Sequence, residues 1–156
     1  MLELVINDPI DYDLLKMLYS DKEDLARAWP KAKFPLCSAE MSRWLGAGVK
    51  PVSLLFKCND SFIGHVVLRS NDQNQLFLCF VLLNKQFRGQ GLIYQVLSKV
   101  ETFVSKNFVE KEIYLHVDPN NHAALRAYEK QGYEKIAVTD KGRFRMLKSI
   151  TDEKRL

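Results

Sequence analysis

The fold of this chain is decided by the stretch LFLCFVLLNKQFRGQGL, residues 76–92. Its first eight residues, Leu76–Leu83, are apolar on both faces, a pattern typical of a central strand buried in a sheet. A glycine-containing turn follows, and residues 92–107 then place apolar side chains along one helical stripe, with polar ones largely opposite. Since a second apolar strand is predicted at residues 113–117, the order strand, helix, strand predicts a right-handed crossover that makes the two strands parallel.

The rest of the chain predicts further helices and strands around this unit. Helical spacing of apolar residues predicts helices at residues 11–20, 22–29, 38–46 and 121–131. Hairpin patterns predict strands at residues 52–58, 62–68, 133–138 and 143–148. At 156 residues the chain has the length of one domain, without a linker or a repeat. We therefore expect a single α/β domain over residues 1–150, a mixed central sheet flanked by helices, followed by a frayed tail at residues 151–156.

Composition excludes several classes of protein. Hydrophobic residues make up 47% of the chain and charged residues 27%, which is close to an average globular protein. No apolar run reaches the roughly 18 residues that a membrane span requires. The N-terminus also lacks the pattern of a secretory signal, so we expect a cytoplasmic protein without membrane contact. The three cysteines are an odd number without a C-x-x-C pair, so neither a disulfide framework nor a metal site is expected.

Charge is distributed unevenly along the chain. The net charge is +4, yet residues 1–29 hold seven acids against three bases. This acidic excess would attract a cationic amine, although solvated helix faces explain it equally well. The basic remainder suits a phosphate-bearing partner, but no aromatic stripe runs among the bases, so we do not expect a nucleic-acid partner.

The turn Gln86-Phe87-Arg88-Gly89-Gln90-Gly91-Leu92 has the features of a phosphate site. Two glycines let the backbone approach a ligand closely, several N–H groups lack helical acceptors, and the helix dipole adds partial positive charge. The ordinary nucleotide motifs do not fit, because a Rossmann fingerprint needs a glycine where Tyr94 stands and a Walker A loop needs Gly-Lys-Ser/Thr. A glycine-rich turn without any ligand is the simpler alternative.

A second motif, NHAALRAYEKQGY at residues 121–133, contains two further candidates. On a helix, Asn121 and Tyr128 lie along one face, so both can face one groove. The alternative is structural: Asn121 caps the helix, and Tyr128 is a half-buried core residue.

Together the two motifs resemble those of the GNAT superfamily of N-acetyltransferases, over roughly residues 76–134. The resemblance implies that the central strand splays from its neighbour, so that backbone groups there pair with the pantetheine arm and the thioester carbonyl of acetyl-CoA. It also implies that the glycine turn binds the coenzyme A pyrophosphate, largely through backbone N–H groups, with Arg88 at a spacer position. The residues implied in acetyl-CoA binding are Val81, Leu82, Leu83, Gln86, Phe87, Arg88, Gly89, Gln90, Gly91, Leu92, Asn121 and Tyr128.

The resemblance further implies catalytic roles for two residues. Tyr128 matches the tyrosine that protonates the departing thiolate, a role that suits a phenol because it stays protonated at neutral pH. Ribosomal-protein-type N-terminal acetyltransferases of the superfamily carry a Glu five residues before the position of Asn121, and here that residue is His116. Strand alternation places His116 on the same face as Tyr114, where an imidazole is a candidate base. A hydrogen-bonded structural histidine is the equal alternative.

We therefore expect an acetyl-CoA-dependent N-acetyltransferase that moves an acetyl group to a primary amine, a small molecule or a protein N-terminus, by direct attack. Acetyl-CoA is the co-substrate, the amine acceptor is the other partner, no metal is needed, and the protein is a monomer or a homodimer. The resemblance implies that the acceptor pocket is built largely from the N-terminal helices and the final hairpin. The alternative is a non-catalytic module that binds or senses acyl-CoA. The presence of His116 in place of the Glu favours this alternative, and the presence of Tyr128 argues against it.

Overall fold

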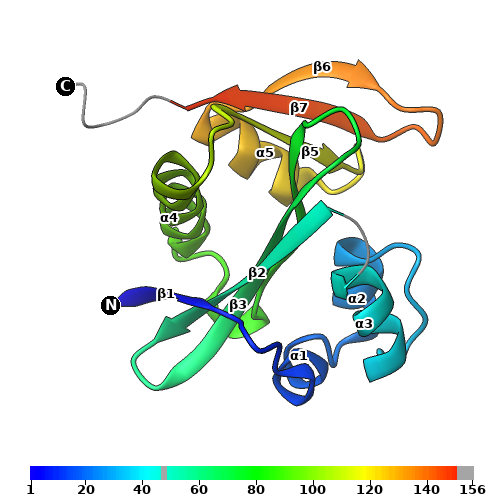
Figure 1. The fold of residues 1–156 in the computed structure, drawn as a ribbon, viewed down its shortest axis with the longest axis vertical. Coiled ribbons are helices and arrows are strands. Elements are labelled where there is room, and N and C mark those ends of the chain that lie inside the picture. Colours follow the sequence, from blue (N-terminus) through cyan, green and yellow to red (C-terminus); the bar gives the residue numbers. More distant parts are fainter. Residues whose placement is uncertain (47–48, 151–156) are drawn as a thin grey trace.

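One sheet of seven strands runs through the residues that the computed structural model describes, 1–46 and 49–150 (Figure 1). Its strand order is β1-β2-β3-β4-β5-β7-β6, and only the pairing of β4 with β5 is parallel. The strands are β1 (Leu2–Ile6), β2 (Val49–Cys58), β3 (Ser61–Ser70), β4 (Leu76–Leu83), β5 (Glu112–Val117), β6 (Glu134–Val138) and β7 (Phe144–Ser149). The helices are α1 (Tyr12–Leu18), α2 (Lys22–Ala28), α3 (Ser38–Gly46), α4 (Leu92–Asn107) and α5 (His122–Gln131).

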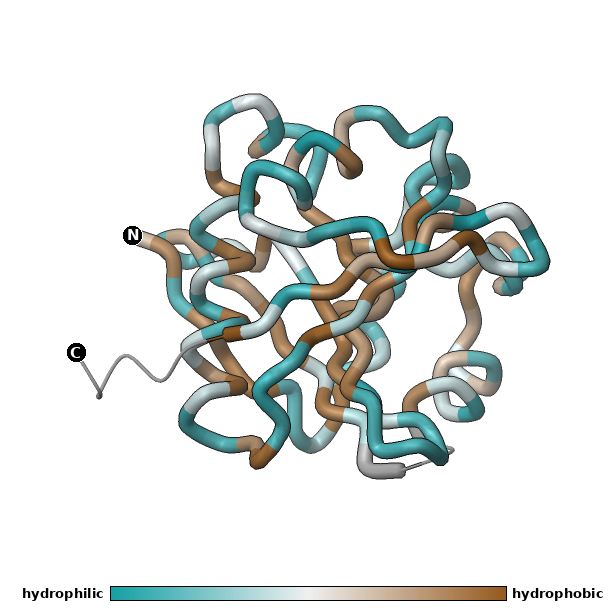
Figure 2. The backbone as a smooth tube through the Cα atoms, turned by 90° about the horizontal axis from the view of Figure 1, so that it is seen from above, coloured by the Kyte–Doolittle hydropathy of each residue, from teal (hydrophilic) through white to brown (hydrophobic). Residues whose placement is uncertain are grey.

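Helices cover both faces of the sheet and form two apolar cores with it. The first core joins α4 and α5 to one face, and the second joins α1, α2 and α3 to the other. Strand β4 supplies both, with Leu78 in the first core and Leu82 in the second, which confirms the prediction of a central strand apolar on both faces. Figure 2 shows the apolar segments, in brown, running through the interior, while the outer loops are mostly teal.

The predicted helices and strands are present, with ends shifted by a few residues. One strand was not predicted: β1, at the apolar opening of the chain, pairs antiparallel with β2, Leu2 opposite Cys58. An edge strand this short carries too little alternation to signal itself in the sequence. The tail expected to fray, residues 151–156, lies outside the described residues.

Strand β4 carries a bulge opposite β3. His65 pairs with Leu82 while Val67 pairs with Cys79, so β4 has one residue more than β3 in this interval. Phe80 lies in the bulge with a left-handed φ of 54°, a conformation that bulky residues rarely adopt. The bulge therefore needs contacts that hold it in place.

The parallel pairing of β4 with β5 is short. It consists of Leu76 with Ile113 and Phe77 with Tyr114, and it ends there. Strand β5 stays paired with β7 from Glu112 to Val117. The predicted parallel crossover is confirmed, and beyond Phe77 the two strands separate within the sheet.

Candidate active site

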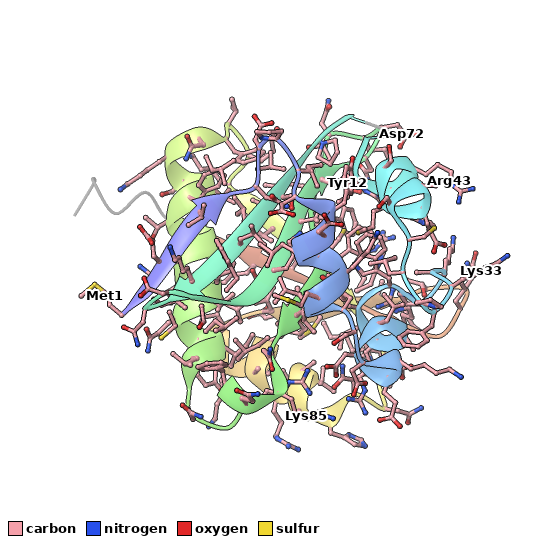
Figure 3. The ribbon with its side chains drawn as sticks, turned by 90° about the horizontal axis from the view of Figure 1, so that it is seen from below. Met1, Tyr12, Lys33, Arg43, Asp72 and Lys85 are labelled. Atoms are coloured by element: carbon pink, nitrogen blue, oxygen red, sulfur yellow. The ribbon has the colours of Figure 1, made fainter. Side chains whose placement is uncertain are left out.

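The glycine turn lies between β4 and α4. It begins with a 3₁₀ turn at Lys85–Phe87, which Asn84 caps by accepting a hydrogen bond from the Gln86 N–H. Lys85, labelled in Figure 3, lies at the edge of the molecule in that view. Gly89 and Gly91 have φ angles of 76° and 77°, which L side chains rarely adopt, and a Cβ on either would meet nothing within 4 Å. The turn is therefore open above both glycines.

The backbone N–H groups of this turn are available to a ligand. Gly89, Gln90 and Gly91 donate their backbone N–H to no acceptor in the part of the chain that the structure describes. Gly91 precedes α4 and offers that helix no side-chain cap, so the positive end of its dipole is also unsatisfied. This arrangement fits an anion such as the coenzyme A pyrophosphate.

The Arg88 side chain turns away from the glycines. Its Nη2 lies 2.9 Å from Oδ1 of Asp24 on α2, and its Nε donates to the Leu83 carbonyl at 2.8 Å. Asp24 is only 8% exposed while the Arg88 side chain is 36% exposed, so this ion pair is shielded from solvent on its carboxylate side. In the structure the guanidinium joins the turn to α2 and to the end of β4, and the backbone of the turn is what faces outward.

Val81, Leu82 and Leu83 follow the bulge in β4. On one side Leu82 and Leu83 pair with His65 and Gly64 of β3. A Cβ on Gly64 would lie 2.9 Å from the Leu82 carbonyl oxygen, so the glycine permits this approach of the strands. On the β5 side no strand pairs with them among the described residues. This free backbone edge fits the predicted pairing with a pantetheine arm.

Tyr128 lies on α5 and is only 7% exposed. Its ring packs edge-on against Tyr133, with ring centroids 5.9 Å apart. Within the described residues its hydroxyl has no hydrogen-bond partner, yet it is not among the buried polar atoms that are sealed from solvent. Burial raises the pKa of Tyr128 to about 12, with Arg143 acting in the opposite direction and Cys79 in the same one. The phenol therefore carries its proton at neutral pH and has it free to donate.

Asn121 is the N-cap of α5. Its side chain accepts a hydrogen bond from the Ala124 N–H at 3.3 Å, which is the structural role weighed from the sequence. Its Nδ2 donates to no group of the described chain, so the amide keeps a donor for a ligand. The two roles are compatible.

His116 lies on β5 with Tyr114, on the face opposite the buried Ile113 and Leu115, as the alternation predicts. Its ring centroid is 5.0 Å from that of Phe77. Burial lowers the pKa of His116, and the charges of Arg145 and Arg143 lower it further, so the imidazole is neutral at neutral pH. Its Nε2, however, accepts a hydrogen bond from Arg145 Nε at 3.0 Å, which places the ring proton on Nδ1. The lone pair that a base needs is already engaged.

A buried chain of hydrogen bonds reaches the bulge from the other core. The Tyr19 hydroxyl donates to the Phe80 carbonyl at 2.6 Å and lies 2.8 Å from His65 Nδ1. His65 Nε2 lies 2.7 Å from the Ser53 hydroxyl, and Asn7 Nδ2 donates to the same oxygen at 3.1 Å. Because the Tyr19 proton goes to Phe80, His65 must donate from Nδ1 and accept from Ser53 at Nε2. Every member is satisfied by one neutral arrangement.

Sequence reasoning missed this chain of hydrogen bonds. The structure buries His65 completely, and burial lowers its pKa to about 3. The only local signal is a histidine in an otherwise apolar strand, which says nothing of Tyr19 or Ser53. The hydrogen bonds link a side chain after β1, one on β2, one on β3 and Tyr19 after α1, and they end on the backbone carbonyl of the bulge in β4.

The comparisons with known proteins agree with this geometry. The family model described as acetyltransferase (GNAT) family matches residues 15–133. The chain belongs to the GNAT acetyltransferase family. The expected GNAT fold, a mixed sheet flanked by helices, is confirmed by solved structures of this family.

Two solved GNAT structures illustrate the likeness. A spermidine N-acetyltransferase from Vibrio cholerae in complex with CoA and spermine has a TM-score of 0.77 at 16% identity, over 95% of each chain. The aminoglycoside acetyltransferase AAC(6')-Ib in complex with coenzyme A has a TM-score of 0.78 at 16% identity, over 99% of this chain and 98% of that one. At these identities the likeness concerns the fold.

One curated relative matches part of the chain. N-alpha-acetyltransferase 30 of Schizosaccharomyces pombe is 30% identical over 79 residues, which are 48% of this chain. The chain spans about half the length of that relative, 52%. In the described residues, no helix is long and apolar enough to cross a membrane, and no group of three His, Cys, Asp or Glu side chains is placed to hold a metal ion.

Removing the Tyr19 hydroxyl should destabilise the protein. Tyr19→Phe leaves the Phe80 carbonyl and the His65 Nδ1–H without partners in a dry interior, which costs about 1–3 kcal/mol. Urea unfolding at pH 7 measures the loss. Tyr12→Phe is the matched control on the same helix, since the Tyr12 hydroxyl bonds to no described residue. Equal free energies of unfolding of the two variants would contradict a stabilising role for the buried hydrogen bonds of Tyr19.

Acidification should also destabilise the protein, through His65. Its folded pKa of about 3 lies below the ordinary 6.5, so between these values the unfolded state binds a proton that the folded state does not. This contribution is complete above the unfolded pKa and is lost as the pH falls. From pH 7 to pH 5 we expect the free energy of unfolding to drop by about 2 kcal/mol. Urea unfolding at pH 7 and pH 5 tests the expected drop. If the NMR signals of the His65 ring shift between these pH values, the folded protein binds the proton there, and this contradicts the prediction.

Proposed function

We propose that this chain is an acetyl-CoA-dependent N-acetyltransferase that moves an acetyl group to a primary amine by direct attack. The observation that carries the proposal is the Tyr128 hydroxyl, which is protonated and has no partner among the described residues. Its pKa responds to Cys79 on β4 and to Arg143 beside β7, so the hydroxyl lies near the opening between β4 and β5. The proteins compared above, an N-alpha-acetyltransferase, a spermidine N-acetyltransferase and an aminoglycoside acetyltransferase, support the proposal.

In this proposal the donor half of the site is made mostly of backbone. The N–H groups of Gly89, Gln90 and Gly91 hold the pyrophosphate, and the free edge of β4 pairs with the pantetheine arm. The amide of Asn121 donates to the same arm. An N–H of β4 beyond the bulge stabilises the negative charge that develops on the thioester oxygen. These groups orient the acetyl carbon at the opening where Tyr128 ends.

The chemical step then needs one acid and one route for a proton. The amine nitrogen forms a bond to the acetyl carbon, the carbon–sulfur bond breaks, and Tyr128 gives its proton to the departing thiolate. The amine must lose a proton as it reacts. His116 is the proposed base, and it takes that proton only after its Nε2 leaves the hydrogen bond from Arg145.

The engaged lone pair of His116 also favours a second candidate function. With its Nε2 held by Arg145, the described site has no imidazole ready to act as a base. A module that binds or senses acyl-CoA without turnover would keep the open glycine turn and need no such base. The free hydroxyl of Tyr128 supports the enzyme over this alternative.

The two candidates are separated by one pair of measurements. Calorimetric titration with acetyl-CoA reports binding, and thiol release in the same sample reports turnover on a panel of primary amines. Binding with turnover is the expected result. Binding without turnover on any amine would favour the sensing module, and absence of binding would reject both candidates.

Tyr128→Phe should lower kcat by about a hundredfold, because general acid catalysis contributes at least that much to such steps. The affinity for acetyl-CoA should stay within about twofold, since the proton donor acts in the transition state. Tyr133→Phe is the matched control, because that neighbouring hydroxyl is sealed and has no partner in the described chain. An unchanged kcat in Tyr128→Phe would remove the acid role.

A further inference from the structure

Five cationic side chains gather on the face of the sheet that α4 and α5 do not cover. We call them the cationic rim: Lys31 after α2, Arg69 on β3, Lys141 in the turn between β6 and β7, Arg143 before β7 and Arg145 on β7. In Figure 1 α2 and the turn between β6 and β7 lie on the same side of the molecule, at the right of the view. The rim thus combines segments from the two ends of the chain.

Electrostatic effects show that these cations lie together. The nearby Lys141 amine lowers the pKa of Lys31, and the charge of Arg69 lowers it further. Burial raises the pKa of the Cys79 thiol, while the charges of Arg69 and Arg143 act in the opposite direction. Arg69 and Arg143 of the rim therefore lie near Cys79, on the part of β4 where the pairing with β5 has ended.

The arginines of the rim are held over the site by specific contacts. The guanidinium of Arg145 lies over the Phe77 ring and that of Arg69 over the Phe80 ring, each 5.7 Å from the ring centroid. Arg143 donates from Nη2 to a backbone carbonyl of β5 at 3.3 Å. All three are partly buried, so their charges are less screened than those of surface residues.

None of these charges has a carboxylate partner within 4 Å among the described residues. The ion pairs of the described chain lie elsewhere: Asp13 with Lys16, Asp21 with Lys85, Asp24 with Arg88, and Glu101 with Lys148. The three arginines of the rim are partly buried like charges without counterions, which is unfavourable, and a bound anion relieves it.

The acidic excess of residues 1–29 does not supply these counterions. Asp11 and Asp21 cap α1 and α2 by accepting backbone N–H groups, and Asp24 pairs with Arg88. These acids are used in the local structure of the N-terminal helices.

We propose that the acceptor is a primary amine that also carries a carboxylate or a phosphate, which Arg145, Arg143 and the neighbouring rim cations bind. This inference rests on the proposed function, because it concerns the acceptor half of the same site. A polyamine would meet like charges there. Carboxylate and phosphate are the anions that guanidinium groups bind in bidentate fashion.

The rim has a second effect on such an acceptor. Nearby positive charges lower the pKa of an ammonium group, so they favour the uncharged amine that attacks the acetyl carbon. One set of cations thus binds the anionic end of the acceptor and helps to deprotonate its amino end. The demand on a protein base decreases accordingly.

Matched pairs of amines test the proposal by thiol release with acetyl-CoA. The pairs are O-phosphoethanolamine with ethanolamine, lysine with cadaverine, and the dipeptide Met-Glu with Met-Gln; they separate phosphate, small carboxylate and peptide sources. In at least one pair the more anionic member should have a kcat/KM about tenfold higher or more, as expected for a charge-assisted contact. Equal or better turnover of the less anionic member in all three pairs would overturn the proposal.

Two variants check that the rim is responsible. Arg145→Gln removes a guanidinium that is fixed by its contacts. Lys141→Glu reverses the charge of an exposed side chain in a turn, and we do not expect this change to affect folding. Each should lower the ratio of kcat/KM for the preferred anionic amine to kcat/KM for its counterpart about tenfold. The ratio is the readout because Arg145 also engages His116 Nε2, so its removal acts on the turnover of both amines. Lys106→Gln, at the exposed end of α4, is the control and should change neither. The assignment would be contradicted if the preference for the anionic amine were lost only in Lys106→Gln. It would also be contradicted if Arg145→Gln and Lys141→Glu both kept that preference.

Failure of this proposal and failure of the proposed function give different results. Acetyl-CoA binding with turnover of less anionic amines alone would keep the function and reject the anionic acceptor. If no amine is acetylated, calorimetry of the acetyl-CoA-loaded protein with O-phosphoethanolamine and with glutamate decides. Binding that Arg145→Gln abolishes supports the rim as an anion site, and absence of binding by both probes overturns it.

Discussion

The parallel pairing of β4 with β5 stops after two residue pairs, and the site depends on that interruption. Two strands that lose their pairing in the middle of a sheet would ordinarily pair again or shift in register. Here each half is held independently: β4 stays paired with β3, and β5 with β7. The two apolar cores, one on each face, fix the helices against both halves. The backbone left unpaired between them is what a ligand can complete, in the way that an added strand completes an edge.

Both halves of the site are organised around this opening. The proposed donor side is largely neutral and made mostly of backbone: the glycine turn, the free edge of β4 and the N-capping Asn121. The proposed acceptor side is made of side chains and is strongly positive, with Arg145 over Phe77 and Arg69 over Phe80. Tyr128 lies on α5, near enough to Cys79 of β4 and to Arg143 of the rim for both to affect its pKa.

The sequence predicted the fold well because its signals are local. The apolar stretch before the glycine turn, the helical stripe after it and the second motif each lie within about one element. The features that were not predicted join residues far apart. Arg88 pairs with Asp24, and the Tyr19 hydroxyl donates to the Phe80 carbonyl, and no periodicity relates such positions. A residue's partner was therefore missed even where its segment was predicted correctly, as with His116 and Arg145.

The buried chain of hydrogen bonds has a direction. Each donor points the same way, from Asn7 through Ser53, His65 and Tyr19 to the Phe80 carbonyl. It begins at an amide that releases no proton and ends at a carbonyl that takes none, so it conducts no proton. It polarises instead, because aligned hydrogen bonds strengthen one another. This polarisation reaches the carbonyl oxygen of the peptide between Phe80 and Val81. The Val81 N–H of the same peptide becomes a stronger hydrogen-bond donor, in the part of β4 that is not paired with β5.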